Sequence, residues 1–177
     1  MKKYVALFRA INVGGRNLLS MKSLREYLEE LGCSDVQSYI QSGNVVFRHH
    51  SNSTSKLKRS ICSAVETNHN FKPELMILDE RQIQEAIDEN PYNTETGKFL
   101  HFYFFEDIPD NPDTEKLDAL KKESEDYTIT RKTLYLYAPE GIGRSKLAAN
   151  VEKCSGVATT ARNWNTIQRL SQLLERV

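Results

Sequence analysis

The stretch with the clearest chemical potential runs from Pro139 to Lys146 and reads Pro-Glu-Gly-Ile-Gly-Arg-Ser-Lys. Gly141 and Gly143 allow a tight turn between a strand-like and a helix-like run, and Arg144 and Lys146 add positive charge at the start of that helix. A helix N-terminus presents unpaired N–H groups and a partial positive charge, so these residues indicate a seat for an anion. The spacing is not that of the P-loop, which ends in Gly-Lys-Ser/Thr.

The same stretch also suits an ordinary Gly-rich turn from strand to helix with two solvated cations. Ser145 lies in this turn, but a serine nucleophile requires a neighbouring base, and the sequence identifies none. We therefore expect Ser145 to act mainly at the start of the helix, and we assign no catalytic residue.

A second group of polar residues follows the first strand-like run, Tyr4–Ile11. Asn12, Gly14, Gly15 and Arg16 form a turn there. A hairpin signal, Ser-Gly-Asn, then joins the runs Val36–Gln41 and Val45–His49. It contributes three further polar side chains, Gln41, Ser42 and Asn44.

Two arginines and one tryptophan each leave two interpretations open. Arg9 lies in an otherwise apolar strand, so it either pairs with a carboxylate or points into a cleft to hold an anion. Arg162 has the same two alternatives. Asn163 opens the last helix and suits either a cap or a ligand contact, and Trp164 either stacks a ring or joins the core.

Apolar periodicity and turn residues predict the order β-α-β-β-α-β twice, an α+β arrangement of tandem ferredoxin-like subdomains with an added C-terminal helix. Capping-box spacing marks helix starts at Ser23 with Glu26 and at Asp79 with Gln82, and Ser145–Glu152 is expected to be a helix. We expect a first subdomain over residues 1–79, a connecting helix and linker over 80–98, a second subdomain over 99–162, and the C-terminal helix over 163–177.

This topology brings the polar groups together at strand ends. Right-handed crossovers make the first two strands parallel, so the end of strand one meets the hairpin between strands two and three. In the second half, the ends of strands three and four share an edge. We therefore expect Asn12–Arg16 beside Gln41–Asn44, and Glu140–Lys146 near Arg162–Trp164.

Four motifs carry a resemblance to a known family. They are Phe8–Gly15, which contains Ile-Asn-Val-Gly-Gly, then Gln41–Phe47 with Gln-Ser-Gly-Asn, Glu140–Lys146, and Thr160–Thr166 with Thr-Ala-Arg-Asn-Trp. In this order they resemble the bacterial family called domain of unknown function 1697. The resemblance covers almost the whole chain and implies a tandem pair of ferredoxin-like subdomains without an assigned activity. Lysine is common in the family where Asn17 stands, so this chain lacks one cation at the expected anion site.

Charge and composition narrow the class of protein. The chain has 24 Lys/Arg and 24 Asp/Glu, so no global field favours DNA or an anionic membrane. Residues 1–79 and 132–177 each carry a net charge of +4, and residues 80–131 carry −8. Attraction for anions is therefore expected at both ends of the sequence.

The remaining residue types indicate a soluble, cytoplasmic protein. Cys33, Cys62 and Cys154 are an odd number without metal spacing and are expected to be reduced, mostly buried thiols. The four histidines also lack metal spacing, so we expect no metal and no cofactor. No apolar run approaches the roughly 20 residues of a membrane helix.

Three hypotheses for function remain. The first is a binding or enzymatic site for a phosphorylated small molecule, a nucleotide or a nucleic-acid end, in a cleft between strand-end loops. Its anion would be held by Arg9, Arg16, Arg144, Lys146 and Arg162, with Trp164 stacking on a ring.

The second hypothesis is an RNA-binding module, which needs aromatic residues on both central strands, where this chain offers Tyr4 and Phe47. The third is a homo-oligomeric interaction protein that packs through aromatic residues of the second half, Tyr103, Phe105, Tyr135 and Tyr137. Exposure of those rings in the monomer would favour it.

Overall fold

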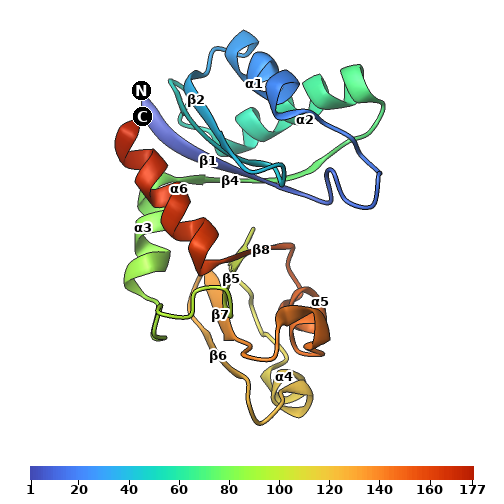
Figure 1. Cartoon of the computed structure of the whole chain (residues 1–177), viewed down its shortest axis with the longest axis vertical. Coiled ribbons are helices and arrows are strands. Elements are labelled where there is room, and N and C mark those ends of the chain that lie inside the picture. The colour runs from blue at the N-terminus through green and yellow to red at the C-terminus, as the bar shows by residue number, and fades with distance from the viewer. The chain divides into compact units, whose positions relative to one another are not determined.

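The computed structural model describes all 177 residues, and its element order is β-α-β-β-α-β twice, with two further helices (Figure 1). The first set is β1 (Lys2–Arg9), α1 (Met21–Glu30), β2 (Ser34–Tyr39), β3 (Asn44–His49), α2 (Thr54–His69) and β4 (Glu74–Asp79), followed by α3 (Glu80–Asp88). The second set is β5 (Leu100–Phe105), α4 (Thr114–Leu120), β6 (Asp126–Ile129), β7 (Thr133–Tyr137), the 3₁₀ helices η1 (Ile142–Arg144) and η2 (Ala148–Asn150), α5 (Val151–Ser155) and β8 (Thr159–Asn163), followed by α6 (Trp164–Arg176).

The chain packs as two compact units. Unit 1 comprises Met1–Gln84 together with Arg169–Val177, and unit 2 comprises Glu85–Gln168. Helices α3 and α6 therefore each contain residues of both units. The subdomain boundaries expected from the sequence follow element order rather than packing, and they stay a prediction.

Unit 1 contains a four-stranded antiparallel sheet in the order β2-β3-β1-β4. Tyr4, Ala6 and Phe8 are every second residue of β1, so they share one face of the strand. They are buried against α1 and α2, which lie on that face (Figure 1). Val5 and Leu7, on the opposite face of β1, are buried as well. Burial on both faces explains why β1 is apolar at almost every position.

Unit 2 contains a second antiparallel sheet, in the order β6-β7-β5-β8. All six residues of β5 are buried, and Phe102 meets the Tyr135 ring edge-on at a centroid distance of 4.8 Å. Helices α4 and α5 cover the other face of the sheet, where Leu117 and Val151 join the core (Figure 1). The two sheets confirm the predicted α+β tandem ferredoxin-like fold.

Side-chain caps begin most of the helices. Asp79 and Gln82 form the predicted reciprocal cap at α3, with Oδ1 of Asp79 accepting from Gln82 N at 2.9 Å and Oε1 of Gln82 accepting from Asp79 N at 3.0 Å. At α1, Ser20 rather than Ser23 is the cap, since its Oγ accepts from Ser23 N at 2.9 Å. No helix in the structure is both long and apolar enough to cross a bilayer.

The predicted helix Ser145–Glu152 is wrong. The chain instead makes two single-turn 3₁₀ helices before the short helix α5, which begins at Val151. The cause is local, because Oγ of Ser145 accepts from Ala148 N at 3.0 Å and Nδ2 of Asn150 donates to Lys146 O at 2.8 Å. These side chains compete with regular helical hydrogen bonding.

Candidate functional site

In unit 1 the turn after β1 meets the hairpin between β2 and β3, as the topology predicts. The backbone N–H of Phe8 donates to Gly43 O at 2.8 Å, and Nδ2 of Asn12 donates to Gln41 O at 3.0 Å. The two segments, residues 10–19 and 40–44, are called the loop pair below. They form one edge of the unit.

Asn12 is the centre of the loop pair. Its Nδ2 donates to Leu19 O at 2.8 Å as well as to Gln41 O, and its Oδ1 accepts from Leu19 N at 2.8 Å. Its backbone N–H donates to Asn17 O at 3.1 Å, and Nδ2 of Asn17 donates to Ala10 O at 2.9 Å. One side chain thus closes the first loop and ties it to the second.

Several non-glycine residues of the loop pair adopt left-handed backbone conformations. Their φ angles are +52° at Ala10, +55° at Asn12, +50° at Asn17 and +51° at Ile40. Asparagine tolerates this region, whereas β-branched isoleucine is a genuine outlier there. Such strain persists only where the surrounding contacts impose it, and it concentrates at functional sites.

Gly14, Gly15 and Arg16 form the tip of the first loop. The glycines have φ angles of +58° and +73°, and no atom lies within 4 Å of an added Cβ at either position. Their N–H groups have no acceptor within the chain, and the exposed Arg16 side chain forms no ion pair. Free backbone donors beside a guanidinium are able to bind an anion.

In the hairpin half of the loop pair, Gly43 and Asn44 have structural roles. Asn44 is fully buried, and its Nδ2 donates to Ser42 Oγ at 2.8 Å. A Cβ at Gly43 would lie 2.5 Å from Phe8 Cβ, so only glycine lets the hairpin approach β1 this closely. Gln41 and Ser42 are exposed and face solvent.

Arg9 lies in an ion pair. Its Nη1 is 3.3 Å from Oε2 of Glu74, its direct cross-strand partner in β4, and its side chain is 34% exposed. The first of the two interpretations, a tie to a carboxylate, is therefore the one that the structure contains.

In unit 2 the ends of β7 and β8 lie at the same edge of the sheet, as predicted. Tyr137 at the end of β7 is opposite Leu100, and Asn163 at the end of β8 is opposite the next residue, His101. The Gly-rich turn and the Arg-Asn-Trp motif therefore both leave the sheet at this edge.

Most motif residues in unit 2 have structural contacts. Oδ1 of Asn163 accepts from Thr166 N at 3.0 Å and caps α6, and Nη1 of Arg162 donates to Ala161 O at 2.8 Å. The Trp164 ring lies 5.7 Å from that of Phe102, and Ser145 is buried in its own turn.

The Gly-rich turn of unit 2 carries negative as well as positive charge. Glu140 accepts hydrogen bonds from Lys122 Nζ at 2.8 Å and Ser124 Oγ at 2.6 Å, and both contacts lower the pKa of its carboxyl group. Arg144 and Lys146 are exposed nearby in the sequence. Because the turn is followed by a 3₁₀ turn and holds a carboxylate, it lacks the free helix N-terminus expected from the sequence.

A sequence profile decides the family of this chain. The family described as "Protein of unknown function (DUF1697)" matches residues 1–135. The chain belongs to the DUF1697 family. The loop pair lies within the matched residues of this DUF1697 protein, and the Gly-rich turn and the Arg-Asn-Trp motif lie beyond them.

A solved structure shares the fold. The chain is similar to the conserved bacterial protein SP0830 from Streptococcus pneumoniae, with a TM-score of 0.73, 22% identity, and coverage of 98% of each chain. No curated protein matches the chain.

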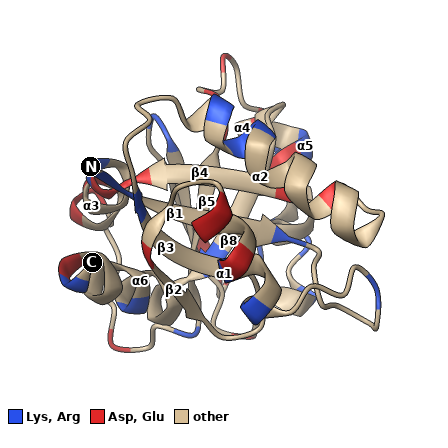
Figure 2. Cartoon of the chain, turned by 90° about the horizontal axis from the view of Figure 1, so that it is seen from above, with Lys and Arg blue, Asp and Glu red and all other residues tan.

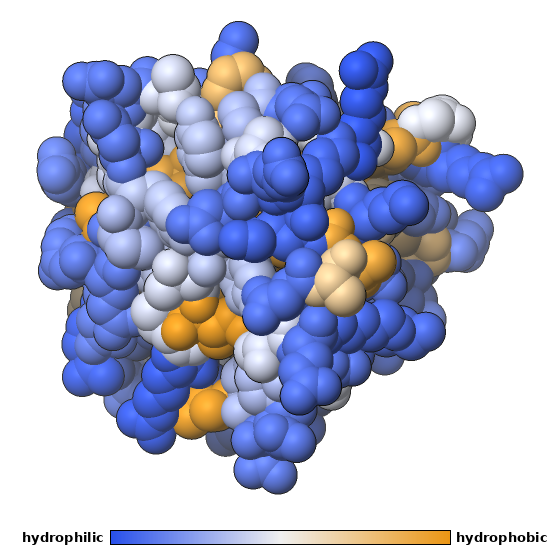
Figure 3. Space-filling view, turned by 90° about the horizontal axis from the view of Figure 1, so that it is seen from below, coloured by the Kyte–Doolittle hydropathy of each residue, from blue (hydrophilic) through white to orange (hydrophobic).

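The contacts that would favour RNA binding or assembly are not exposed in the DUF1697 protein. Tyr4 and Phe47 are buried with their rings 5.7 Å apart, so the central strands offer no aromatic platform to bases. In unit 2, Tyr103, Phe105 and Tyr135 are buried too, and Tyr137 is half-buried with its ring stacked on that of Tyr92. The face drawn in Figure 3 is mainly hydrophilic, with small and separate apolar patches.

The titratable groups whose pKa values are shifted lie outside the loop pair. His101, on β5, is buried, which lowers its pKa from the ordinary value of 6.5. The three cysteines are free and buried, and burial raises the pKa of Cys33 to about 12. No group of three or more His, Cys, Asp or Glu side chains is placed to hold a metal ion.

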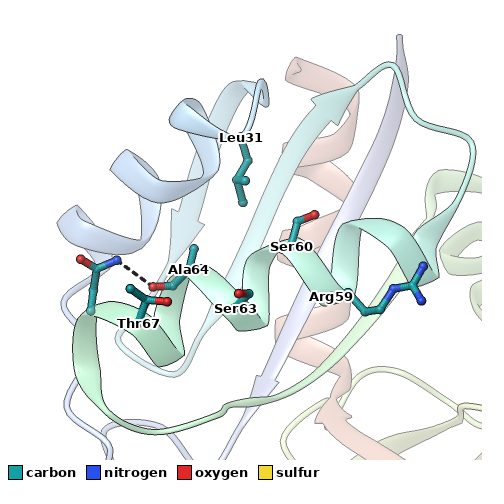
Figure 4. A pocket seen from close by; sticks show the side chains of 7 residues that line it. Leu31, Arg59, Ser60, Ser63, Ala64 and Thr67 are labelled. Carbon is teal, nitrogen blue, oxygen red and sulfur yellow. Dashed lines mark hydrogen bonds between the residues drawn. The ribbon is translucent and has the colours of Figure 1, made fainter.

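The sequence did not indicate an open hollow of about 540 Å³ along α2. Arg59 stands at one end and Thr67 lies toward the other, with small residues between them and Leu31 opposite (Figure 4). The lining includes Ser60, Ser63, Ala64, Thr67 and Asn68, and Nδ2 of Asn68 donates to Ala64 O at 2.8 Å. A stripe of small helical residues with one cation is weak support for a ligand site.

Surface charge is mixed on the helices. Figure 2 shows both signs on α1 and on α6. The loop pair differs, because its residues 10–19 and 40–44 contain Arg16 and no acidic residue. Of the strand-end segments, it is the one best suited to an anion.

Proposed function

We propose that this DUF1697 protein binds a phosphorylated small molecule, such as a nucleotide or a nucleic-acid end, at the loop pair of unit 1. The backbone N–H groups of Gly14 and Gly15 donate to the anionic group, and Arg16 supplies the countercharge. Gln41 and Ser42 offer side-chain hydrogen bonds at the rim.

The observation that supports this most is the contrast between the two parts of the loop pair. Asn12, Asn17 and Asn44 use their side chains within the loops, whereas the N–H groups of Gly14 and Gly15 and the side chain of Arg16 have no hydrogen-bond partner in the chain. A rigid scaffold that holds free donors away from the body of the protein favours recognition. Neither segment presents a paired acid and base, so we propose binding without a reaction.

An NMR titration of the amide signals with inorganic phosphate and adenosine monophosphate tests the proposal. The Gly14 and Gly15 amide signals should shift in a saturable way, since both N–H groups would gain an acceptor. Charge-assisted hydrogen bonds contribute about 1.5–3 kcal/mol, so Arg16→Gln should weaken binding by roughly 10-fold or more.

Arg131→Gln is the matched control, because Arg131 is an exposed arginine in the β6–β7 hairpin of unit 2. Its affinity for both anions should equal that of the parent protein. Absence of any saturable shift at Gly14 and Gly15, or equal affinity of the Arg16 variant, would contradict the proposal.

A further inference from the structure

The loop pair also carries an unusual share of exposed apolar side chains. Val13 and Leu18 are each 65% exposed, and Ile40 is 56% exposed. Only two other large hydrophobic residues of the chain are exposed, Met1 and Ile108. An apolar group that is concentrated on one small segment calls for an explanation in a way that scattered ones do not.

These residues lie in the same two short segments as the proposed anion donors. Val13 directly precedes Gly14, Leu18 follows Asn17, whose carbonyl accepts from Asn12, and Ile40 precedes Gln41, whose carbonyl also accepts from Asn12. The hydrogen bonds of Asn12 therefore tie together the two backbone segments that carry the three aliphatic residues and the Gly14–Arg16 tip.

Ile40 strengthens the argument. Its φ angle of +51° is costly for a β-branched residue, and its side chain points to solvent, so burial in the core does not offset that cost. Asparagine or glycine would relieve the strain. An exposed isoleucine in this conformation favours a binding role for its side chain.

We infer that the ligand is an amphiphilic anion, a molecule with one anionic group attached to an aliphatic body. This inference rests on the proposed function and names the ligand class of the same site. The anionic group is held by Arg16 and the Gly14 and Gly15 amides, and the aliphatic body covers Val13, Leu18 and Ile40.

The same chemistry occurs at the surface of an anionic bilayer, but the loop pair fits a single molecule better. Segments that insert into bilayers rely on aromatic residues and many cations. The exposed apolar residues here are all aliphatic, and of the three cations in residues 10–25, Lys22 lies 3.9 Å from Glu26. Each cation adds only about 1 kcal/mol of attraction to an anionic membrane.

Titrations with inorganic phosphate, ethyl phosphate, butyl phosphate and hexyl phosphate test the inference, again through the Gly14 and Gly15 amide signals. Each fully buried methylene group should strengthen binding about fourfold. Hexyl phosphate should therefore bind at least roughly 10-fold more tightly than ethyl phosphate, even if only half of the added chain is covered.

Variants separate the two proposals. Leu18→Ser should remove most of the gain with chain length and leave the affinity for inorganic phosphate unchanged, whereas Arg16→Gln should weaken every member of the series. Ile108→Ser, at an aliphatic residue of unit 2 that is 43% exposed, is the matched control and should behave like the parent protein.

If inorganic phosphate binds and the series shows no gain with chain length, the inference fails and the proposed function stands. If no member shifts the glycine signals, both fail. Sedimentation with vesicles of phosphatidylcholine and phosphatidylglycerol then measures binding to a membrane surface. Leu18-dependent binding to vesicles without any gain from ethyl to hexyl phosphate would overturn the choice of a single molecule.

Discussion

Replacement of Asn12 by glycine tests whether one side chain holds the loop pair together. The change removes three side-chain hydrogen bonds, two donated to Leu19 O and Gln41 O and one accepted from Leu19 N. Each bond contributes about 1 kcal/mol to stability, and somewhat less where water competes. Glycine relieves the left-handed φ of +55° by about 1 kcal/mol but adds a similar backbone entropy to the unfolded chain.

Asn17→Gly is the matched variant, because Asn17 is also left-handed, at φ +50°, but donates only one side-chain hydrogen bond, to Ala10 O. The glycine contributions cancel between the two variants, so their difference reports two hydrogen bonds. We expect Asn12→Gly to be less stable than Asn17→Gly by about 1–2 kcal/mol.

Urea unfolding followed by far-ultraviolet circular dichroism measures the two free energies, with the slope m checked for constancy. The Gly14 and Gly15 amide signals should also broaden in Asn12→Gly, since the tip would lose its anchor. Equal unfolding midpoints for the two variants would refute the assignment of Asn12 as the residue that ties the loops.

Three further outcomes are expected from the structure. Ile40→Asn should raise the free energy of unfolding by about 1 kcal/mol, because asparagine tolerates the left-handed φ, and Ile40→Val should leave it unchanged; equal stabilities in urea would contradict this. Gly43→Ala should destabilise by more than about 2 kcal/mol because its Cβ would meet Phe8, whereas Gly14→Ala, with open space around it, should cost only the φ strain of about 1 kcal/mol. Burial lowers the pKa of His101 below its unfolded value of 6.5, so stability is fully present above that pH and falls as the pH drops. His101→Gln should flatten that fall below about pH 6.5, and an unchanged slope of midpoint against pH would count against it.

Much of the fold could be predicted because its signals are local. The reciprocal cap of Asp79 and Gln82 depends on residues only three apart, and it is confirmed. Asn163 caps α6 through the same local geometry, which is one of the two roles that the sequence left open. The meeting of the two loops of unit 1 then follows from topology alone. Once the element order was right, right-handed crossovers left little freedom for the strand ends.

The features that the sequence did not decide depend on competition between local contacts or on how the strands pair. Ser145 and Asn150 favour helix starts as well as tight turns, and in this chain the turns prevail. The partner of Arg9 depends on the register of β1 against β4, which no pattern within β1 predicts. The left-handed Ile40 was beyond prediction, because isoleucine favours strands.

Unit 1 is discontinuous along the chain, and this has a consequence for its synthesis. Nζ of Lys3, in β1, donates hydrogen bonds to Glu80 Oε1 at 3.1 Å and to Leu174 O at 2.7 Å. Leu174 is translated long after Glu80. A nascent chain on the ribosome has all of residues 85–168 before it has Arg169–Val177. Unit 2 can therefore complete its sheet early, while unit 1 must wait for those final residues to emerge before its first strand has every neighbour.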